Sequence, residues 1–524
     1  MTTATSPRRS AAGQRHRKNE EGHHPAGRYC LCMATATSDK SAGLRGRFWL
    51  KGNPDDEAIS GRLFLVPGSN PLLELDGQLT PVMEETDRRK LPDGTEVVVS
   101  SPISSVDLVR QSLDIHGTLE TGEDVTLPAA FTAGWTMGGS GYNSHRLQAF
   151  YAIRGDHVDG AAALFTRVRV RIRHLDAWAR LPGFSRTLDL AAGKKGLAFD
   201  PPEVPPATLA SGAQVTLDQV TGWIGPDVTG GRVERTLWMK VEGTPPVTYR
   251  ALGRTIIKPL MNLLALSVSA ECPVVEAEVS IGADHPWLAV HSATLKPAAE
   301  TIISPRRVLL PLTETGLNGV AKWLDSVERL GPLPSVVARA AGQRDDPLET
   351  QLLEMTTATE GLHRLLLQQH QRMTNDQASE ARDKALDALK ELPADVRDAV
   401  RSALQHLTDQ SYPRRLLDLA DHVGQAVPGV TGITQQWKKR VTATRVGFAH
   451  ALEHGFLDED NAEEAMTILQ SIRWLLTGLL LLQTGIEAAA LGRLLNAYEG
   501  YQMFLEQARV WLPAVYETPA EPAQ

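Results

Sequence analysis

The chain has 524 residues, more than one hydrophobic core usually supports, so we expect two or three domains. Its composition, 42% hydrophobic and 22% charged, is ordinary for a globular protein, and a net charge of −8 leaves only local basic patches for phosphate contacts. Three cysteines, Cys30, Cys32 and Cys272, are too few for a disulfide scaffold or a four-thiolate zinc site. A reducing cytoplasm is therefore the expected compartment.

The two ends of the chain carry few large apolar side chains. We predict disordered tails over residues 1–40 and 514–524, with Met33 as an alternative start of the protein. No run of about 18 apolar residues occurs, and the nearest candidate, residues 474–486, is bracketed by Arg473 and Glu487. We interpret it as a buried helix and expect no contact with a membrane.

Residues 41–310 have the pattern of a β-rich domain. Short runs of alternating apolar and polar residues, such as 61–66, 96–99, 164–173 and 274–280, are separated by Gly, Pro, Asn and Asp. Many short strands of this kind predict a sandwich-like fold, either as one domain or as two β modules.

Helical periodicity replaces strand alternation over residues 311–513. One helix is expected to begin after Pro347 and a second after Pro393, since proline suits the first turn. Residues 432–454, 460–484 and 487–510 predict three more. Short connections between long helices favour an antiparallel helical bundle.

A basic segment of this helical region holds residues suited to RNA cleavage. Internal attack by the 2′-hydroxyl needs a base, an acid for the leaving 5′-oxygen, and a fixed cation on the phosphate. His450 titrates near neutrality and Arg445 presents a planar fork that fits phosphate. Three further cations could hold the RNA backbone: Lys438, Lys439 and Arg440.

The spacing of Arg445 and His450 is itself ambiguous. A separation of five places two side chains about 140° apart on an ideal helix, so they share a face only if the helix is distorted, for example at Gly447. Alternatively, a two-fold dimer could complete the site from two chains. The remaining interpretation is an exposed arginine and an unrelated histidine on a helix face.

Six short motifs resemble the ApeA family of anti-phage defence proteins, which join an N-terminal β domain to a C-terminal HEPN RNase domain. Four resemble the N-terminal domain: Gly46-Arg-Phe-Trp-Leu50, Ile59-Ser-Gly-Arg-Leu63, Leu73-Glu-Leu-Asp-Gly77 and the stretch from Phe165 to Trp178. Two resemble the HEPN domain: Thr359-Glu-Gly-Leu-His-Arg364 and Thr444-Arg-Val-Gly-Phe-Ala-His450. The resemblance covers most of the chain from about residue 44 to residue 510.

The resemblance implies a metal-independent endoribonuclease of abortive infection that needs no cofactor. Arg445 would contact the scissile phosphate, His450 would be the acid and base, and Glu360 would orient one of them. Host RNA, with tRNA as one candidate, would be cut to a 2′,3′-cyclic phosphate under control of the N-terminal domain. A homo-oligomer through the HEPN domain would be expected, and the phage trigger is unknown.

One departure from the family pattern supports an alternative. Val446 follows Arg445, where many HEPN nucleases carry a polar residue. The helical region would then be a catalytically inactive interaction or nucleotide-binding module, and the β domain would bind the ligand or partner.

Two spacings within the helical region also suit metal ligands. His450 and His454 are four apart but lack the zincin glutamate, while Glu360 and His363 lack the second pair that a carboxylate-bridged site needs. We therefore expect no metal.

The strand over residues 164–173 has apolar side chains on one face and four arginines on the other. The arginines are Arg167, Arg169, Arg171 and Arg173. Like charges at this spacing repel, so acidic neighbours should offset them. The alternative is a docking strand for RNA or for an acidic phage component.

Overall fold

The computed structural model describes residues 43–517 except 54–56, 82, 93–94, 105–106, 108–109, 138–142, 190–193, 200–201, 225–231, 298–302, 305–306, 343–345, 368–370 and 451–461. The tail expected over residues 1–40, with Cys30, Cys32 and Met33, lies outside the described residues. Residues 42–524 form one compact unit. The tail expected over residues 514–524 is ordered at its start, because Pro513–Tyr516 form the helix α15 and Val515 is buried.

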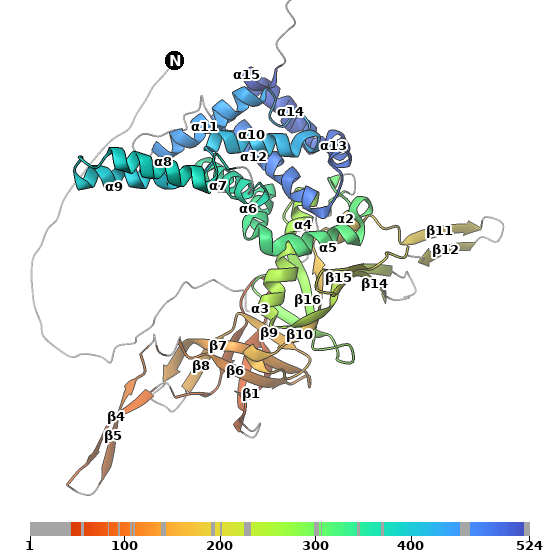
Figure 1. The fold of residues 1–524 in the computed structure, drawn as a ribbon. Coiled ribbons are helices and arrows are strands. Elements are labelled where there is room, and N and C mark those ends of the chain that lie inside the picture. Colours follow the sequence, from red (N-terminus) through yellow and green to blue (C-terminus); the bar gives the residue numbers. More distant parts are fainter. Residues whose placement is uncertain are drawn as a thin grey trace, which may run out of the picture. The chain divides into compact units, whose positions relative to one another are not determined.

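Six strands close into a barrel in the N-terminal part of this unit (Figure 1). Their order around the ring is β1 (Leu44–Leu50), β2 (Ile59–Phe64), β3 (Leu72–Leu75), β8 (Asn143–Gln148), β7 (Asp124–Met137) and β6 (Leu113–Leu119). Antiparallel pairing of β7 with β8 completes the circle. Fully buried side chains fill the interior, among them Phe48, Leu63, Leu73, Ile115 and Leu127. The β-rich region is thus confirmed, and its strands close into a barrel instead of stacking as two sheets.

Two glycines of the recognised motifs allow the barrel strands to approach closely. Gly46 and Gly61 face each other across β1 and β2. A Cβ at Gly46 would lie 2.7 Å from the carbonyl oxygen of Thr118, and one at Gly61 would lie 2.5 Å from that of Glu74. Since both contacts are with backbone, neither can be relieved by a side-chain rotation.

The same sheet continues beyond the barrel from β7. Its further strands are β9 (Tyr151–Arg154), β17 (Leu288–Ser292), β16 (Val274–Ser280), β10 (Phe165–Ile172), β15 (Arg232–Val247), β14 (Gln214–Ile224) and β13 (Ala207–Thr208). Two hairpins pair separately: β4 (Met83–Lys90) with β5 (Glu96–Pro102), and β11 (Phe184–Asp189) with β12 (Lys194–Phe199). The period of two expected in β10 is confirmed, because Val168, Val170 and Ile172 are all buried.

Helices interrupt the region that was expected to hold strands alone. Among the described residues they include α2 (Leu175–Ala179) and a continuous segment of α3 (Tyr249–Leu252), the π-helical turn η3 (Gly253–Ile257) and α4 (Lys258–Val268). The α4 segment was missed because apolar residues lie on most of its sides, which leaves no amphipathic period. Tyr249–Val268 and Ala462–Thr484 have the length and composition of membrane spans, yet most of each is buried within the protein. Both pack as core helices.

The C-terminal part is helical, as predicted. Its helices are α5 (Leu312–Leu330), α6 (Leu333–Ala341), α7 (Leu348–Leu366), α8 (Asn375–Ala388), α9 (Ala394–Ala403), α10 (Tyr412–Val423), α11 (Thr434–His450), α12 (Ala462–Leu481), α13 (Ala488–Ala497), α14 (Glu499–Trp511) and α15. α7 and α9 begin after Pro347 and Pro393 as expected. The single helix expected over residues 487–510 is two, because Tyr498 between α13 and α14 is extended.

The apolar packing divides the molecule near residue 150. One cluster of buried residues runs from Phe48 to Ala152 and fills the barrel. A second runs from Tyr151 to Val515 and joins the remaining strands to the helices. Within this second cluster, α4 of the N-terminal region contacts α5 of the helical region. The indole Nε1 of Trp323 in α5 donates to the carbonyl oxygen of Pro259 in α4 at 2.9 Å. Strands beyond the barrel and helices therefore share one core.

Candidate active site on three helices

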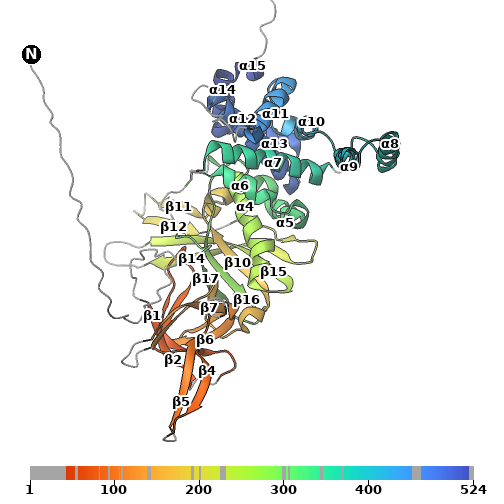
Figure 2. The same cartoon turned by 90° about the vertical axis from the view of Figure 1, so that its left-hand side faces the viewer.

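Helices α7, α10 and α11 pack against one another and carry the candidate site (Figure 2). On α7, Leu352, Met355 and Leu362 are buried, which leaves Glu360 at the edge of the packed face. On α11, Trp437 and Val441 are fully buried, and the indole Nε1 of Trp437 donates to Ser471 of α12 at 2.9 Å. These contacts fix the rotation of both helices about their axes.

The structure brings Glu360 and Arg445 together. Nη2 of Arg445 donates to Oε2 of Glu360 at 2.9 Å, and the side chains of Arg445 and Glu360 are 33% and 27% exposed, respectively. The pair is thus close to solvent, where an ion pair alone adds little stability but can set the direction of a guanidinium.

Tyr412 of α10 supplies a second contact to Arg445. The guanidinium carbon of Arg445 lies 4.1 Å from the centroid of the tyrosine ring, a cation–π distance. The phenol oxygen of Tyr412 accepts a hydrogen bond from Thr359 at 3.2 Å. Burial raises the pKa of Tyr412 to about 12, against smaller opposing effects of Thr359 and Arg445. The ring is therefore neutral across the physiological range.

Two more arginines surround the other oxygen of Glu360. Oε1 lies 3.4 Å from Nη2 of Arg364 and 3.9 Å from Nη1 of Arg415. Asp409 is the second carboxylate of the cluster, 3.8 Å from Arg364 and 3.9 Å from Arg415. Three guanidinium groups thus share two carboxylates, which leaves an excess of positive charge for an anion.

Arg415 is the most deeply buried of these arginines, with its side chain only 4% exposed. Its Nε donates to the carbonyl oxygen of Gln410 at 2.9 Å, but Nη1 has no hydrogen-bond partner among the described residues. Burial lowers the pKa of Arg415, the neighbouring Arg364 lowers it further, and Glu360 and Asp409 oppose both effects. An unsatisfied buried donor of this kind is costly and suits a group awaiting a ligand.

A cavity of about 250 Å³ opens beside this arginine. It is lined by His363, Arg364, Leu367, Gln371, Thr408, Asp409, Gln410 and Arg415. Guanidinium groups at the wall of a small polar cavity are suited to binding phosphate oxygens. The lining histidine, His363, is already engaged, because its Nε2 lies 3.0 Å from Oδ2 of Asp418 and both side chains are buried.

His450 ends α11, five residues after Arg445 on the same helix. The side chains of residues 448–450 and all of residues 451–461, including His454, lie outside the described part of the chain. The catalytic role of His450 therefore stays a prediction. Val446, the departure from the family pattern, is 49% exposed.

The three cations proposed to hold RNA lie in the first half of α11. Lys438 contacts Gln435 at 2.6 Å, Arg440 lies 3.3 Å from Glu464, and Lys439 is exposed. Lys438 precedes Arg445 by seven residues, so the two share a helix face about 10 Å apart along the axis. Lys439 and Arg440 project from other sides of the helix.

The arginines of β10 are matched by acidic neighbours. Arg167 pairs with Glu242 of β15, while Arg169 and Arg171 pair with Glu278 and Glu276 of β16. Arg167 and Arg169 also lie over the ring of Trp287, at 4.5 and 4.7 Å. Arg173 donates to the carbonyl oxygen of Pro297 at 3.1 Å. These pairings leave little free charge for docking, which stays a prediction.

Tyr412 and Arg415 were missed in the sequence, although one signal points to them. Arg414 and Arg415 lie in the first turn of α10, just after Pro413. The first turn of a helix favours acidic residues, because the macrodipole is positive there. Two adjacent arginines at that position break a local rule, as functional residues often do.

Two known families match the chain. The family described as ApeA N-terminal domain 1 matches residues 43–323, and the family described as Apea-like HEPN matches residues 353–490. No curated protein and no solved structure matches the chain. The first match covers the barrel, the rest of the sheet and most of α5. The second covers most of α7 and all of α10 and α11, with Glu360, Arg415 and Arg445. The chain belongs to the ApeA family, with a β-rich N-terminal region followed by a HEPN region, a fold that commonly acts as an RNase.

Proposed function

We propose that the protein is a metal-independent endoribonuclease of anti-phage defence that cuts host RNA during abortive infection, with tRNA as one candidate substrate. Membership of the ApeA family and the presence of a HEPN region support this proposal. The observation that carries it is the position of Arg445, which is held by Glu360 and Tyr412 next to a cavity walled by Arg364 and Arg415.

The proposed reaction divides between one histidine and a set of arginines. His450 takes the proton of the 2′-hydroxyl, the 2′-oxygen bonds to phosphorus, and the bond from phosphorus to the 5′-oxygen breaks. A proton from His450 neutralises the leaving oxygen, and a 2′,3′-cyclic phosphate remains. Arg445 stabilises the charge that grows on the phosphoryl oxygens, and Glu360 keeps its guanidinium in one direction. Lys438, on the face shared with Arg445, contacts the RNA backbone further along.

We further propose that the N-terminal region controls this activity, because a nuclease of this kind must be silent in healthy cells. The shared core of strands and helices supports such control, since a rearrangement of the sheet changes the packing of α4, α5 and their neighbours. We place the protein in the cytoplasm, as a homo-oligomer through the HEPN region in which a second copy brings its own Arg445 and His450 close by.

One observation favours a second candidate function. Val446 is an exposed apolar side chain directly after Arg445, and valine offers no hydrogen bond to RNA. The HEPN region would then be a catalytically inactive module that binds a partner or a nucleotide, and the β-rich region would be the ligand-binding surface.

A growth assay separates the two functions. Cells overproducing the wild-type chain should stop growing, while cells producing Arg445→Ala or His450→Ala at equal levels should grow normally. Arg493→Ala, an exposed arginine on α13, is the matched control and should stay toxic. Equal toxicity of all four proteins, or toxicity from none, would favour the binding module.

A further inference from the structure

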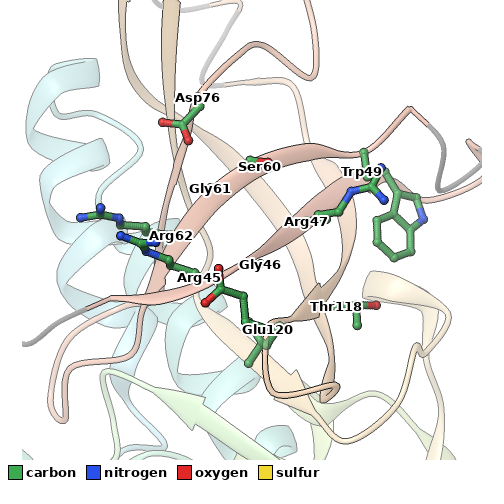
Figure 3. Close-up of a pocket in the computed structure, with 12 residues that line it drawn as sticks. Arg45, Gly46, Arg47, Trp49, Ser60, Gly61, Arg62, Asp76, Thr118 and Glu120 are labelled. Atoms are coloured by element: carbon green, nitrogen blue, oxygen red, sulfur yellow. The ribbon is translucent and has the colours of Figure 1, made fainter.

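A second basic site lies on the outer face of the barrel, away from the three helices. It is an open groove of about 780 Å³ over β1, β2 and β6 (Figure 3). Its charged and aromatic lining residues are Arg45, Arg47, Trp49, Arg62, Asp76 and Glu120. Three arginines against two carboxylates give this groove an excess of one positive charge, although the chain as a whole carries −8.

Two of the arginines face each other, and neither is paired with the carboxylates of the groove. Arg45 and Arg62 are direct partners across β1 and β2, and their side chains lie next to each other in Figure 3. Neither forms an ion pair with any residue that the structure describes. Like charges directly opposite on antiparallel strands destabilise a sheet, so a bound anion would relieve this repulsion. The arginine ladder of β10, by contrast, has a glutamate for three of its four members.

Short side chains around Arg47 create the hollow. In the sheet register Arg47 lies between Ser60 on β2 and Thr118 on β6. Both are too small to cover the strand. The hydroxyl group of Ser60 can donate to a phosphate or sugar oxygen, while that of Thr118 donates to Oδ1 of Asp124 at 2.8 Å. Arg45 and Arg47 follow each other on the outer face at a spacing of about 7 Å, given the rise of a strand. Two cations in line at this spacing suit an extended chain of phosphates.

An aromatic side chain follows Arg45 and Arg47 along the outer face of β1. Trp49 is the next outward residue of β1, and Figure 3 shows Arg47 beside its indole. The indole packs edge-on against His157 at 5.2 Å and against His116 at 6.4 Å, and the two histidines stack on each other. Nε2 of His116 lies 2.9 Å from the carbonyl oxygen of Val158, and Nε2 of His157 lies 3.0 Å from that of Gly117. Both rings, and the tryptophan braced on them, are therefore held in place.

We infer that this groove binds single-stranded RNA, with Arg45, Arg47 and Arg62 on the phosphates and Trp49 stacked on a base. Arginines beside a rigid aromatic ring on an open strand face are the usual means of holding a single strand, whose unstacked bases can reach the ring. The preference for RNA over DNA rests on the proposed function; the affinity for a single strand does not. The groove would hold a part of the RNA that is not being cut, or an RNA that signals infection.

Binding to the full-length protein tests the inference. A fluorescent oligouridine of about 12 nucleotides, within the site size of barrel domains, is methylated at every 2′-oxygen so that internal attack cannot cleave it. Its affinity is measured by anisotropy over a range of salt concentrations, beside the matched DNA oligonucleotide and polyglutamate. The variants are Arg45→Glu/Arg62→Glu, Trp49→Ala and Trp49→Phe. Arg254→Glu, at an exposed arginine of η3, is the charge-matched control.

Arg45→Glu/Arg62→Glu should weaken binding at least tenfold. It should also reduce the slope of log affinity against log salt concentration by more than one unit, because each phosphate contact to a single strand contributes about 0.7 to that slope. Trp49→Ala should weaken binding on the order of tenfold, and Trp49→Phe should recover most of it, because phenylalanine keeps a stacking face. Arg254→Glu should bind as the wild type does. Melting temperatures of all variants, measured in parallel, show which of them are folded.

Three outcomes would overturn the inference. The first is equal binding by wild type, groove variants and control. The second is preferential binding of DNA or polyglutamate. The third is cross-linking of a 4-thiouridine version of the RNA only to α7, α10 or α11 and never to β1. Cross-linking to β1 in a protein that cuts no RNA would sustain the groove and refute the nuclease, so the two proposals fail separately.

Discussion

The guanidinium of Arg445 lies over the ring of Tyr412, 4.1 Å from its centroid, at the place where α10 meets α11. Glu360 approaches the same guanidinium from α7. One arginine is therefore held by two helices besides its own, and three of the predictions below concern the groups that hold it or share its carboxylate.

Removing the carboxylate of Glu360 should impair RNA cleavage more than folding. In Glu360→Ala the guanidinium of Arg445 loses its fixed partner, and misplacement of about 1 Å can cost a hundredfold in rate. The unfolding free energy should change by about 1 kcal/mol or less, because the pair is close to solvent. Glu360→Gln, which keeps an acceptor oxygen, should retain more activity than the alanine variant. The inverse order would contradict the orienting role.

Tyr412 should matter through its ring and not through its hydroxyl group. Tyr412→Phe keeps the face under Arg445 and should cleave RNA at nearly the wild-type rate, with a loss of about 1 kcal/mol of stability from the missing hydrogen bond to Thr359. Tyr412→Leu removes the aromatic face and should lower the cleavage rate several-fold. Denaturant unfolding and initial rates on the same preparations give both quantities. Equal rates for the two variants would show that the ring does not position Arg445.

Arg415 should contribute to binding RNA and not to stability. Replacing a buried charge with an apolar side chain of similar length is often neutral or stabilising, so Arg415→Met should unfold within about 1 kcal/mol of the wild type. The lost charge-assisted contact to phosphate should raise KM for RNA about tenfold or more. Arg493→Met, at an exposed arginine of α13, is the control and should leave KM within about twofold. Strong destabilisation of Arg415→Met with unchanged KM would assign Arg415 a structural role.

The barrel should lose stability in mild acid through His145. Burial lowers the pKa of His145 from 6.5 to about 4, and its Nδ1 has no hydrogen-bond partner among the described residues. Between these values the unfolded chain binds a proton that the folded chain does not, so stability falls as pH decreases from 6.5 towards 4, by roughly 3 kcal/mol at most. Burial also lowers the pKa of His174 and His291, which add to this loss.

Denaturant unfolding at several pH values between 4 and 7.5 measures this loss, with His145→Gln as the variant that cannot titrate there. The variant should show a visibly smaller decline than the wild type across the window. An identical slope for both proteins would mean that His145 is accessible to protons in the folded barrel.

Local patterns predicted many elements, and the family resemblance predicted one contact of the site. The alternation of Val168, Val170 and Ile172 against arginines predicted β10, and Pro347 predicted the start of α7. Family resemblance pointed to Glu360 and Arg445, which the structure brings within 2.9 Å across 85 residues of sequence. In these cases either a short periodic stretch or a known motif carried the information.

Long-range pairing could not be predicted in the same way. The barrel closes because β7 pairs with β8 and β1 pairs with β6, and no local pattern distinguishes this ring from a sandwich. Likewise, Arg415 meets Glu360 only through the packing of α10 on α7. The expected boundary near residue 310 separates strands from helices, but it cannot reveal that both contribute to one core.

RNA ends from arrested cells test the central claim most directly. Total RNA is taken after overproduction of the wild type, His450→Ala, Arg445→Ala and the control Arg493→Ala, and the new ends are typed chemically. The proposed mechanism predicts 2′,3′-cyclic phosphates and 5′-hydroxyls in the wild type and the control, and their loss in the other two. New ends with 3′-hydroxyls and 5′-phosphates, or unchanged cleavage in His450→Ala, would contradict it.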